Sequence, residues 1–578
     1  MVNKNMNIKN KIKNWIKDAL NIENDFVVEH PSDLKNGDYS TNVAMTLSKS
    51  LGKNPVEIAK DFAQKLDENK IPEIERIEQV GGFINFYLSK EFFAKAVEGI
   101  LDMGEKVGEN DLYKDQKIII EYTDPNPFKE FHIGHLMSNS IGESISRIIE
   151  AGGSKIKRLS YGGDVGLHVA KAIFAVLENE DEIEKIKKLG DREQIKFWAD
   201  CYVLGNKKYE EELVSKQKID DLNKVIFEKS DKNINDLYDW GREVSIKYFI
   251  FMFERLDTHF DKNIWESEVT KDAMEAVKQG LKMGVLEESE GAIIFRGENH
   301  SLHTRVFVNS KGVPLYEAKE LGLGIKKYED YTFDKSIVIT GNEQNEYFKV
   351  VLKATELIKP EVASKTIHRG HGMLRFASGK MSSRKGNVIT AEDLLEQVIN
   401  KIFEKIKDRE FSNEEKENIA EVVAIGAIKY SILRQAIGGD IIFDFDKSIS
   451  FEGDSGPYLQ YTAVRAKSVL EKAKFEIRNS KSEINSNFKI QNWETTELER
   501  LLYRFEEVVE RAGKEYAPHH IVTYLTELAG AFNAFYAKEK IVDENDPNST
   551  YKLAITNAVF DTLKKGLYLL GIKTPERM

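Results

Sequence analysis

The middle of the chain alternates between short apolar runs and segments of helical periodicity. From about residue 113 the order is an apolar run at 117–123 (KIIIEYT), a helical segment from His135 to about Ala151, a second run (KIKRLSYGGD) and a helical segment from about Val169. This strand–helix–strand order predicts an α/β domain with a parallel sheet and right-handed crossovers. The apolar run 335–341 (KSIVITG) is predicted to be another buried strand.

The two flanking regions follow other patterns. Residues 1–112 mix amphipathic helices with short strands, which predicts a small α+β domain, and the polar stretch 103–115 is expected to be a linker. After about residue 400 the strands are expected to stop, and four segments of helical periodicity predict an α-helical bundle. We therefore expect three domains, at 1–112, 113–400 and 401–578.

Composition excludes several classes of protein. The hydrophobic fraction of 41% and the charged fraction of 31% are typical of a globular domain, and no apolar run approaches the length needed to span a membrane. The single cysteine, Cys201, excludes an internal disulfide and a cysteine-clustered zinc site. A net charge of −12 argues against non-specific nucleic-acid binding, although a local basic groove remains compatible with it. A cytoplasmic location is expected.

The segment FHIGHL carries a candidate nucleotide site. His132 and His135 are three residues apart at the predicted start of a helix, and Gly134 between them lets a ligand approach the backbone. A helix N-terminus at the carboxyl end of a parallel strand favours phosphate, and two imidazoles there can donate hydrogen bonds to phosphoryl oxygens. The alternative is two incidental histidines near a helix cap, but composition gives only about 0.01 chance occurrences of H-x-G-H.

A second segment, GKMSSRKGN, offers complementary charge. Lys380, Arg384 and Lys385 lie close to two hydroxyl groups, those of Ser382 and Ser383. A loop of this kind can fold over a triphosphate and neutralise the departing pyrophosphate. Taken alone, the segment is more typical of a solvated basic loop, which is what most such runs are.

Together the two segments resemble the signatures of class I aminoacyl-tRNA synthetases. The resemblance implies a Rossmann-like nucleotide-binding domain, and a reaction in which ATP and an amino acid form an aminoacyl-adenylate before transfer to the tRNA 3′ end. It implies ATP accompanied by Mg²⁺, no protein-bound zinc, and ATP contacts from His132, Gly134, His135, Lys380, Met381, Ser382 and Ser383. The family signature usually ends in Lys-Ser, where this chain has Ser383 and Arg384. Lys380, Arg384 or Lys385 is therefore expected to replace the missing second lysine.

The flanking sequences resemble the arginyl-tRNA synthetase family. The resemblance is carried by EYTDPNPFKEFHIGHLMSNSIGESISRIIEAGG, SYGGDVGLH, SFEGDSGPYLQYTAVRA and LLGIKTPERM. It implies that the partners are L-arginine, ATP and tRNA(Arg), and that the enzyme is a monomer with no membrane association. A guanidinium pocket needs carboxylates, which agrees with this assignment.

The same resemblance implies individual site residues. The expected substrate-binding residues are Glu121, Asn126, Asp164, His168, Glu266, Tyr316, Glu320 and Gln344. The family usually has Asp at the position of Glu320 and Gln at that of His168. The expected tRNA-binding residues are Phe83, Asn85, Tyr458, Tyr461, Tyr536 and Met578. The carboxylates in this set have a simpler alternative as surface residues, the Tyr and Phe residues as core residues, and His168 as a packing residue.

Three other functions stay open at this point. A lysine-type class I synthetase would also need carboxylates in its pocket. A non-catalytic, synthetase-like tRNA-binding protein is compatible with the altered 380–384 segment. A small nucleotidylyltransferase shares H-x-G-H, but it would leave the helical last third of the chain unexplained.

Overall fold

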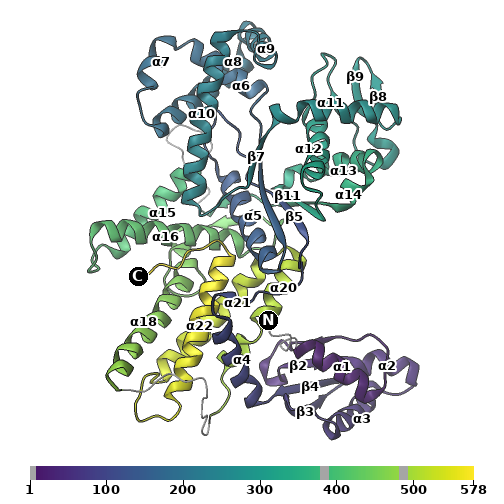
Figure 1. Ribbon diagram of the computed structural model, residues 1–578, viewed down its shortest axis with the longest axis vertical. Helices are drawn as coiled ribbons and strands as arrows, with labels where there is room; N and C mark the ends of the chain where they lie inside the picture. The colour runs from purple at the N-terminus through teal and green to yellow at the C-terminus, as the bar shows by residue number, and fades with distance from the viewer. Residues whose placement is uncertain (1–7, 378–389, 481–492) are drawn as a thin grey trace. The chain divides into compact units, whose positions relative to one another are not determined.

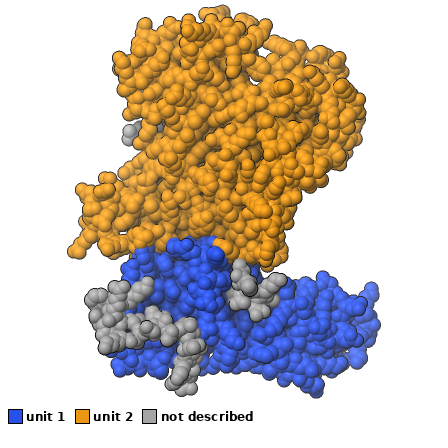
Figure 2. Space-filling view, in the orientation of Figure 1, with its two compact units in different colours: residues 1–108, 462–507, 527–565 blue, residues 109–461, 508–526, 566–578 orange. Residues whose placement is uncertain are grey.

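The computed structural model describes residues 8–377, 390–480 and 493–578 (Figure 1). The chain forms two compact units, coloured separately in Figure 2. Each unit is assembled from three separate segments. The first unit contains residues 1–108, 462–507 and 527–565, and the second contains residues 109–461, 508–526 and 566–578. Among the described residues, no helix is long and apolar enough to cross a membrane.

The second unit is built on a five-stranded parallel sheet, which confirms the predicted fold class. Its strands, in spatial order, are β12 (Thr366–His371), β11 (Lys335–Gly341), β5 (Lys117–Glu121), β6 (Lys155–Gly162) and β7 (Lys262–Trp265). Central β5 carries Ile118, Ile119 and Ile120, all buried, because helices cover both faces of the sheet. The strand order reverses between β5 and β11, and ligands of such sheets bind at the carboxyl ends of the strands beside that reversal.

Helices on the two sides of this sheet carry the residues of interest (Figure 1). The main ones are α5 (Ile133–Ala151), α6 (Leu167–Leu177), α10 (Lys232–Arg255), α11 (Glu266–Lys282), α12 (Tyr316–Tyr331) and α13 (Asn345–Ile358). Helices α11 and α12 pack together through a core that includes Ala273, Val277 and Leu321. A small antiparallel sheet lies between them in sequence, formed by β8 (Glu287–Ser289), β9 (Ala292–Phe295) and β10 (Arg305–Val308).

One sequence-based expectation is wrong. Strands do not stop near residue 400, because β14 (Ile441–Phe443) pairs in parallel with β13 (Leu374–Phe376). A strand of three residues is too short to show a period of its own, and its pairing partner lies about 65 residues earlier in the chain. Strand β14 therefore forms because it pairs with β13, and its own local sequence pattern does not specify it.

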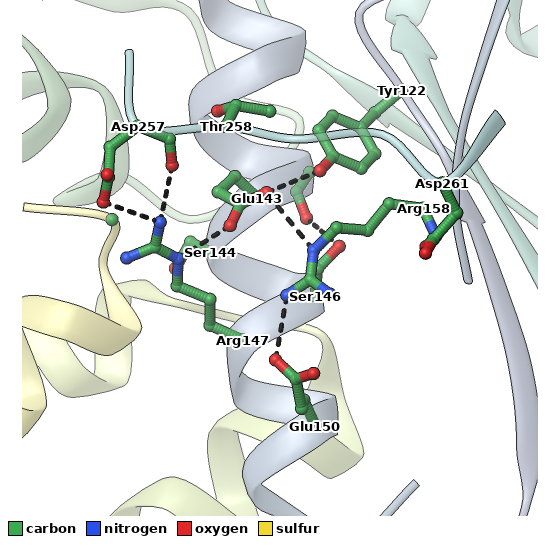
Figure 3. A network of polar contacts seen from close by, with 12 residues as sticks. Tyr122, Glu143, Ser144, Ser146, Arg147, Glu150, Arg158, Asp257, Thr258 and Asp261 are labelled. Carbon is green, nitrogen blue, oxygen red and sulfur yellow. Dashed lines mark hydrogen bonds and ion pairs between the residues drawn. The ribbon is translucent and has the colours of Figure 1, made fainter. Parts of the chain in front are cut away.

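Helix α5 is anchored at the end opposite to its histidines by a buried polar network (Figure 3). The Glu143 carboxylate accepts hydrogen bonds from the Tyr122 hydroxyl at 2.6 Å and from Arg147 Nε at 2.7 Å. Arg158 adds an ion pair with Glu143 at 3.4 Å. The Arg147 guanidinium also donates to the Asp257 backbone oxygen at 2.6 Å. Because these groups are nearly inaccessible to water, losing one partner would leave a buried charge unpaired.

Residues near the end of the chain join the same network within this unit. Arg147 donates to the Tyr568 backbone oxygen at 3.1 Å, and the Ser144 hydroxyl donates to the Leu569 oxygen at 2.9 Å. The buried Lys429 ammonium donates to the Gly571 oxygen at 2.7 Å. The last residues of α22 (Ser549–Leu569) and the turn that follows it thus help to fix the helix that begins with the histidine pair.

The first unit joins a small α+β part to helical segments. Strands β1 (Val28–Glu29), β2 (Tyr39–Thr41), β4 (Phe83–Leu88) and β3 (Ile74–Val80) form an antiparallel sheet, packed with α1 (Ile8–Leu20), α2 (Val43–Leu51) and α3 (Pro55–Glu68). Tyr503, which follows α19 (Glu497–Leu502), belongs to the same core. The later helices are shared between the two units: α18 (Gly456–Ser480), α20 (Phe505–Glu515), α21 (His519–Lys538) and α22 each have residues in both, as the segment bounds of the units show. They agree with the helical last third expected from the sequence.

Candidate active site

The two histidines form a reciprocal cap at the start of α5. The His135 backbone N–H donates to His132 Nδ1 at 3.4 Å, and the His132 backbone N–H donates to His135 Nδ1 at 3.3 Å. Their rings stack with centroids 3.5 Å apart. Because both Nδ1 atoms accept hydrogen bonds, each neutral ring must carry its proton on Nε2. The pair therefore offers two Nε2–H donors at the helix mouth.

Neither histidine is charged near neutral pH. Burial, reinforced by the Lys129 charge, lowers the pKa of His132 to about 4. Burial also holds the pKa of His135 well below its usual value, and the neighbouring His132 acts in the same direction. The pair consequently acts through hydrogen bonds and not through net charge.

Gly134 is required by the geometry of this cap. A Cβ atom at this exposed position would lie 2.9 Å from His132 Cε1 and 3.0 Å from His132 Nδ1. A side chain there would push the His132 ring out of its stack. The absence of a side chain thus preserves both the imidazole geometry and the access to the backbone.

The loop between β5 and α5 is held to the end of β6. Thr123, Asp124 and Phe128 have positive φ angles of 79°, 48° and 67°. Asp124 Oδ1 accepts from the Tyr161 backbone N–H at 2.8 Å, and Asn126 Oδ1 accepts from that of Gly163 at 2.9 Å. These bonds offset a backbone conformation that ordinary residues rarely adopt.

A cluster of acidic side chains adjoins this loop, and it contains two lysines. Glu266, the first residue of α11, accepts from Lys319 Nζ through Oε2 at 2.6 Å. Glu121, at the end of β5, accepts from Lys327 Nζ at 2.8 Å. Both lysines lie on α12, which also carries Glu320, and all four paired side chains are buried.

This acidic cluster has more carboxyl groups than ammonium groups. Burial, together with the Glu121 charge, raises the pKa of Glu320 to about 8, while Lys327 acts in the opposite direction. Burial and Glu121 also hold the pKa of Asp124 well above its usual value. With Glu266 this makes four carboxyl groups against the ammonium groups of Lys319 and Lys327, an arrangement that favours a cationic ligand.

Asp164 and His168 bind other parts of the protein. The fully buried Asp164 carboxylate accepts from the Ser267 backbone N–H at 2.9 Å and from the Ser267 hydroxyl at 2.7 Å. Arg242 Nε and the Tyr238 hydroxyl each donate to it at 3.1 Å. These bonds fix the first turn of α11 and therefore the position of Glu266.

His168 lies in the first turn of α6, at the edge of the same region. Its Nε2 is 2.8 Å from the Gly163 backbone oxygen, to which it donates. Burial lowers the pKa of His168 to about 3, with Lys129 acting in the same direction. This neutral ring supports the Gly163 turn beside Asn126.

Tyr316 and Gln344 are the exposed members of the expected substrate-binding set among those described. Tyr316 is the first residue of α12 and is 63% exposed, so it is not a core aromatic residue. Its backbone oxygen accepts from the Tyr347 hydroxyl at 3.0 Å. Gln344 is exposed in the short helix η4 (Asn342–Gln344) directly after β11, next to the end of β5.

Sequence reasoning missed three groups in and beside this acidic cluster. Lys319 and Lys327 stand in a run of alternating charge, EAKELGLGIKK, a pattern usually typical of a solvated helix face. Tyr161 packs against the cluster that contains Val269 and Leu323, and its buried hydroxyl has no hydrogen-bond partner among the described residues. A tyrosine in a strand gives no signal of such a role.

The second signature segment lies outside the described residues. This applies to Lys380, Met381, Ser382, Ser383, Arg384 and Lys385. The chain that follows is described, and it runs beside the histidines. An isolated β-bridge joins Thr390 to His132, and the Ala391 backbone N–H donates to the Phe131 oxygen at 2.8 Å.

The candidate tRNA contacts occupy different environments. Phe83 begins β4 and is 41% exposed, whereas Asn85 is buried and accepts from the Ser40 hydroxyl at 2.7 Å. Tyr536 on α21 is 44% exposed, and the Arg465 guanidinium lies 5.2 Å from its ring centroid.

The remaining tRNA candidates belong to the second unit. Tyr458 and Tyr461 lie half-buried on α18, and the Tyr461 ring is 6.4 Å from that of Phe451. Met578 is half-buried. Among the described residues there is no group of three or more His, Cys, Asp or Glu side chains that could hold a metal ion.

Three family models match successive parts of the chain. Residues 96–445 match the family described as tRNA synthetases class I (R), catalytic domain. Residues 6–88 match the arginyl tRNA synthetase N terminal domain, and residues 459–578 match the DALR anticodon binding domain.

Whole proteins agree with these matches. The chain is 31% identical to the arginine–tRNA ligases of Halothermothrix orenii and Clostridioides difficile. Each alignment spans 99% of this chain. It spans 100% of the Halothermothrix orenii enzyme and 99% of the Clostridioides difficile enzyme. Its fold matches that of Thermus thermophilus arginyl-tRNA synthetase with a TM-score of 0.80 at 23% identity, covering 99% of this chain and 100% of that one. The chain belongs to the arginyl-tRNA synthetase family, within the class I aminoacyl-tRNA synthetases.

Proposed function

We propose that this chain activates L-arginine with ATP and transfers the arginyl group to the 3′ end of tRNA(Arg). The observation that carries the proposal is the carboxyl-rich pocket beside two Nε2–H donors, at the carboxyl edge of a parallel sheet. We further propose that it works as a cytoplasmic monomer, with functional domains at 1–112, 113–400 and 401–578.

The pocket would bind the arginine side chain through its acids. Glu266 and Glu320 come from facing helices, so a planar guanidinium can place its donors between them. The unpartnered Tyr161 hydroxyl is available to accept one more N–H. Asn126, Glu121 and Gln344 are assigned to the α-amino and carboxylate groups, with Tyr316 at the entrance.

Asp164 and His168 have positioning roles in this proposal. Asp164 holds the first turn of α11, and His168 supports the Gly163 turn. Both therefore act on arginine through Glu266 and Asn126.

The arginine carboxylate attacks the α-phosphorus of ATP in line, and pyrophosphate leaves. Positioning of the reactants and stabilisation of the developing charge accelerate this step, and no covalent nucleophile is needed. The Nε2–H groups of His132 and His135 would donate to phosphoryl oxygens at the positive end of α5, where Gly134 leaves the backbone open.

ATP enters this step as its Mg²⁺ complex. Lys380, Arg384 and Lys385 are assigned to the departing pyrophosphate, with Met381, Ser382 and Ser383 beside the nucleotide. The bridge between Thr390 and His132 supports this assignment, because it brings the chain after the segment to the histidines.

Exposed aromatic side chains are the proposed contacts for unpaired tRNA bases. Stacking on aromatic rings suits single-stranded loops, which are the readable parts of a tRNA. Phe83 and Tyr536 have the exposure this requires. Tyr458, Tyr461 and Met578 are proposed near the anticodon, and the buried Asn85 would act by supporting the strand that presents Phe83.

Charging of total tRNA with each amino acid in turn tests the proposal. Arginine should be attached and lysine should not. Glu266→Gln should lose most arginine-dependent activity, whereas Glu268→Gln, exposed in the same helical turn, should keep it. Charging with lysine would favour the lysine-type enzyme. No arginine-dependent AMP release with tRNA present would favour a non-catalytic tRNA-binding protein.

A further inference from the structure

We propose that Lys319 is a built-in competitor for the carboxylate that binds the guanidinium, and that it excludes lysine from the pocket. The inference rests on the proposed role of Glu266 and adds a residue that decides which amino acid can enter. Its basis is an ion pair inside the chain that occupies part of the proposed substrate contact.

The ion pair lies inside the pocket. Lys319 Nζ is 2.6 Å from Glu266 Oε2, and the two side chains are 9% and 5% exposed. The other Glu266 oxygen, Oε1, faces Gly163, 3.3 Å from where a Cβ atom would stand there. The Gly163 backbone N–H donates a hydrogen bond to Asn126 in the loop. Glu266 therefore has one carboxylate oxygen facing this loop and the other paired with Lys319.

A cation that enters must exchange with Lys319. Leaving a buried carboxylate without a partner is strongly unfavourable, so Glu266 exchanges one cationic partner for another. The displaced ammonium has a place to go. The Tyr316 ring centroid is 5.5 Å from Lys319 Nζ, and Tyr316 is 63% exposed at the entrance. A flexible four-carbon stem can carry the charge toward that ring.

The exchange favours a guanidinium over an ammonium. A guanidinium forms paired hydrogen bonds with one carboxylate and has donors left for Glu320 and the Tyr161 hydroxyl. Free lysine offers Glu266 only the contact that Lys319 already makes. The tethered ammonium also has an effective concentration in the millimolar range or above, so free lysine competes poorly. Lys319 therefore removes most of the advantage that an acidic pocket would give to lysine.

Lys327 provides a matched control within the same helix. It is paired with Glu121 at 2.8 Å, the two side chains are 1% and 3% exposed, and it lies about two turns after Lys319. Lys319→Met and Lys327→Met each remove one positive charge from the pocket. Only the first frees the carboxylate assigned to the guanidinium.

The test measures lysine as an inhibitor of arginine charging by the full-length enzyme. In Lys319→Met, the inhibition constant for lysine should fall at least about tenfold, while the KM for arginine stays the same or falls. Lys327→Met should not admit lysine. If Lys319→Met raises the KM for arginine and lysine still fails to inhibit, Lys319 is only a positioning residue. If both variants admit lysine, the total charge of the pocket is responsible and the proposal is wrong.

Two further measurements keep the outcomes distinct. Lys319→Gln retains a hydrogen-bond donor without the charge, and it replaces Lys319→Met with the same expected result if the methionine variant does not fold. Glu266→Gln tests the underlying assignment. If that variant charges arginine normally, the proposed role of Glu266 fails, whatever the Lys319 variants show.

Discussion

Arginine should bind about fiftyfold more tightly at pH 8 than at pH 6, because Glu320 must lose its proton to pair with the guanidinium. The pKa of Glu320 is raised to about 8, chiefly by burial and then by Glu121. At pH 7 only about one carboxyl in ten is therefore ionised before arginine binds. Pairing with a cation lowers the pKa, so binding releases a proton and strengthens as pH rises toward 8.

The magnitude follows from the fraction of protonated carboxyl. Proton competition weakens binding by a factor of about 100 at pH 6, about 11 at pH 7 and about 2 at pH 8. Groups facing Glu320 are Glu121 on β5, Asp124 in the following loop, Glu266 on α11, Lys327 on α12, Tyr161 on β6 and Tyr347 on α13. The pKa values of His132, about 4, and His168, about 3, keep these rings neutral over this range.

Calorimetric titration of arginine into the enzyme would measure both the affinity and the number of protons released on binding. Affinity should rise by nearly one logarithmic unit per pH unit between 6 and 7, and buffers of different ionisation enthalpy should reveal about 0.9 proton released at pH 7. Glu320→Gln should bind more weakly at pH 8 but with a flat pH profile. An affinity independent of pH in the wild-type enzyme would refute the reasoning, and so would an unchanged slope in Glu320→Gln.

Three other changes have definite expected results. His135→Ala should lower the rate of adenylate formation by about 10²–10³ in single-turnover assays and leave tRNA binding nearly unchanged, and a wild-type rate would contradict the role of the pair. Tyr161→Phe should raise the KM for arginine about fivefold to twentyfold without lowering the thermal midpoint, because its hydroxyl has no partner among the described residues; a loss of stability with unchanged KM would assign it to the core. Arg147→Met should destabilise the enzyme by about 3 kcal/mol in denaturant unfolding, because Glu143 loses a buried partner, and Arg76→Met at an exposed pair should change little.

The parallel sheet and the position of the two histidines at the start of a helix could be predicted because their signals are local. The isoleucine run at 118–120 marks a buried strand, and the H-x-G-H spacing places both histidines in one helical turn. By contrast, strand β14 depends on pairing with β13, which no window of local sequence contains.

The acidic side chains around Glu266 and Glu320 show more clearly the limit of prediction from sequence. Glu266 and Glu320 were expected from family resemblance, but their partners were not. Lys319 and Lys327 carry the composition of an exposed helix face, and only packing against α11 and β5 reveals that they are buried. The role of Asp164 also depends on tertiary structure, since its four donors come from α10 and α11. Sequence thus indicates which residue types matter, and packing decides which of them are available to a substrate.

The bond between Ser144 and Leu569 has a consequence for how the enzyme is made. These residues are 425 positions apart, so at about 5–20 residues per second a ribosome needs about 20–85 s to travel from one to the other. During that interval the nascent helix α5, which begins with the histidine pair, lacks the hydrogen bond from Ser144 to Leu569. A working adenylation centre should therefore mature only late in translation, well after the Rossmann strands have emerged.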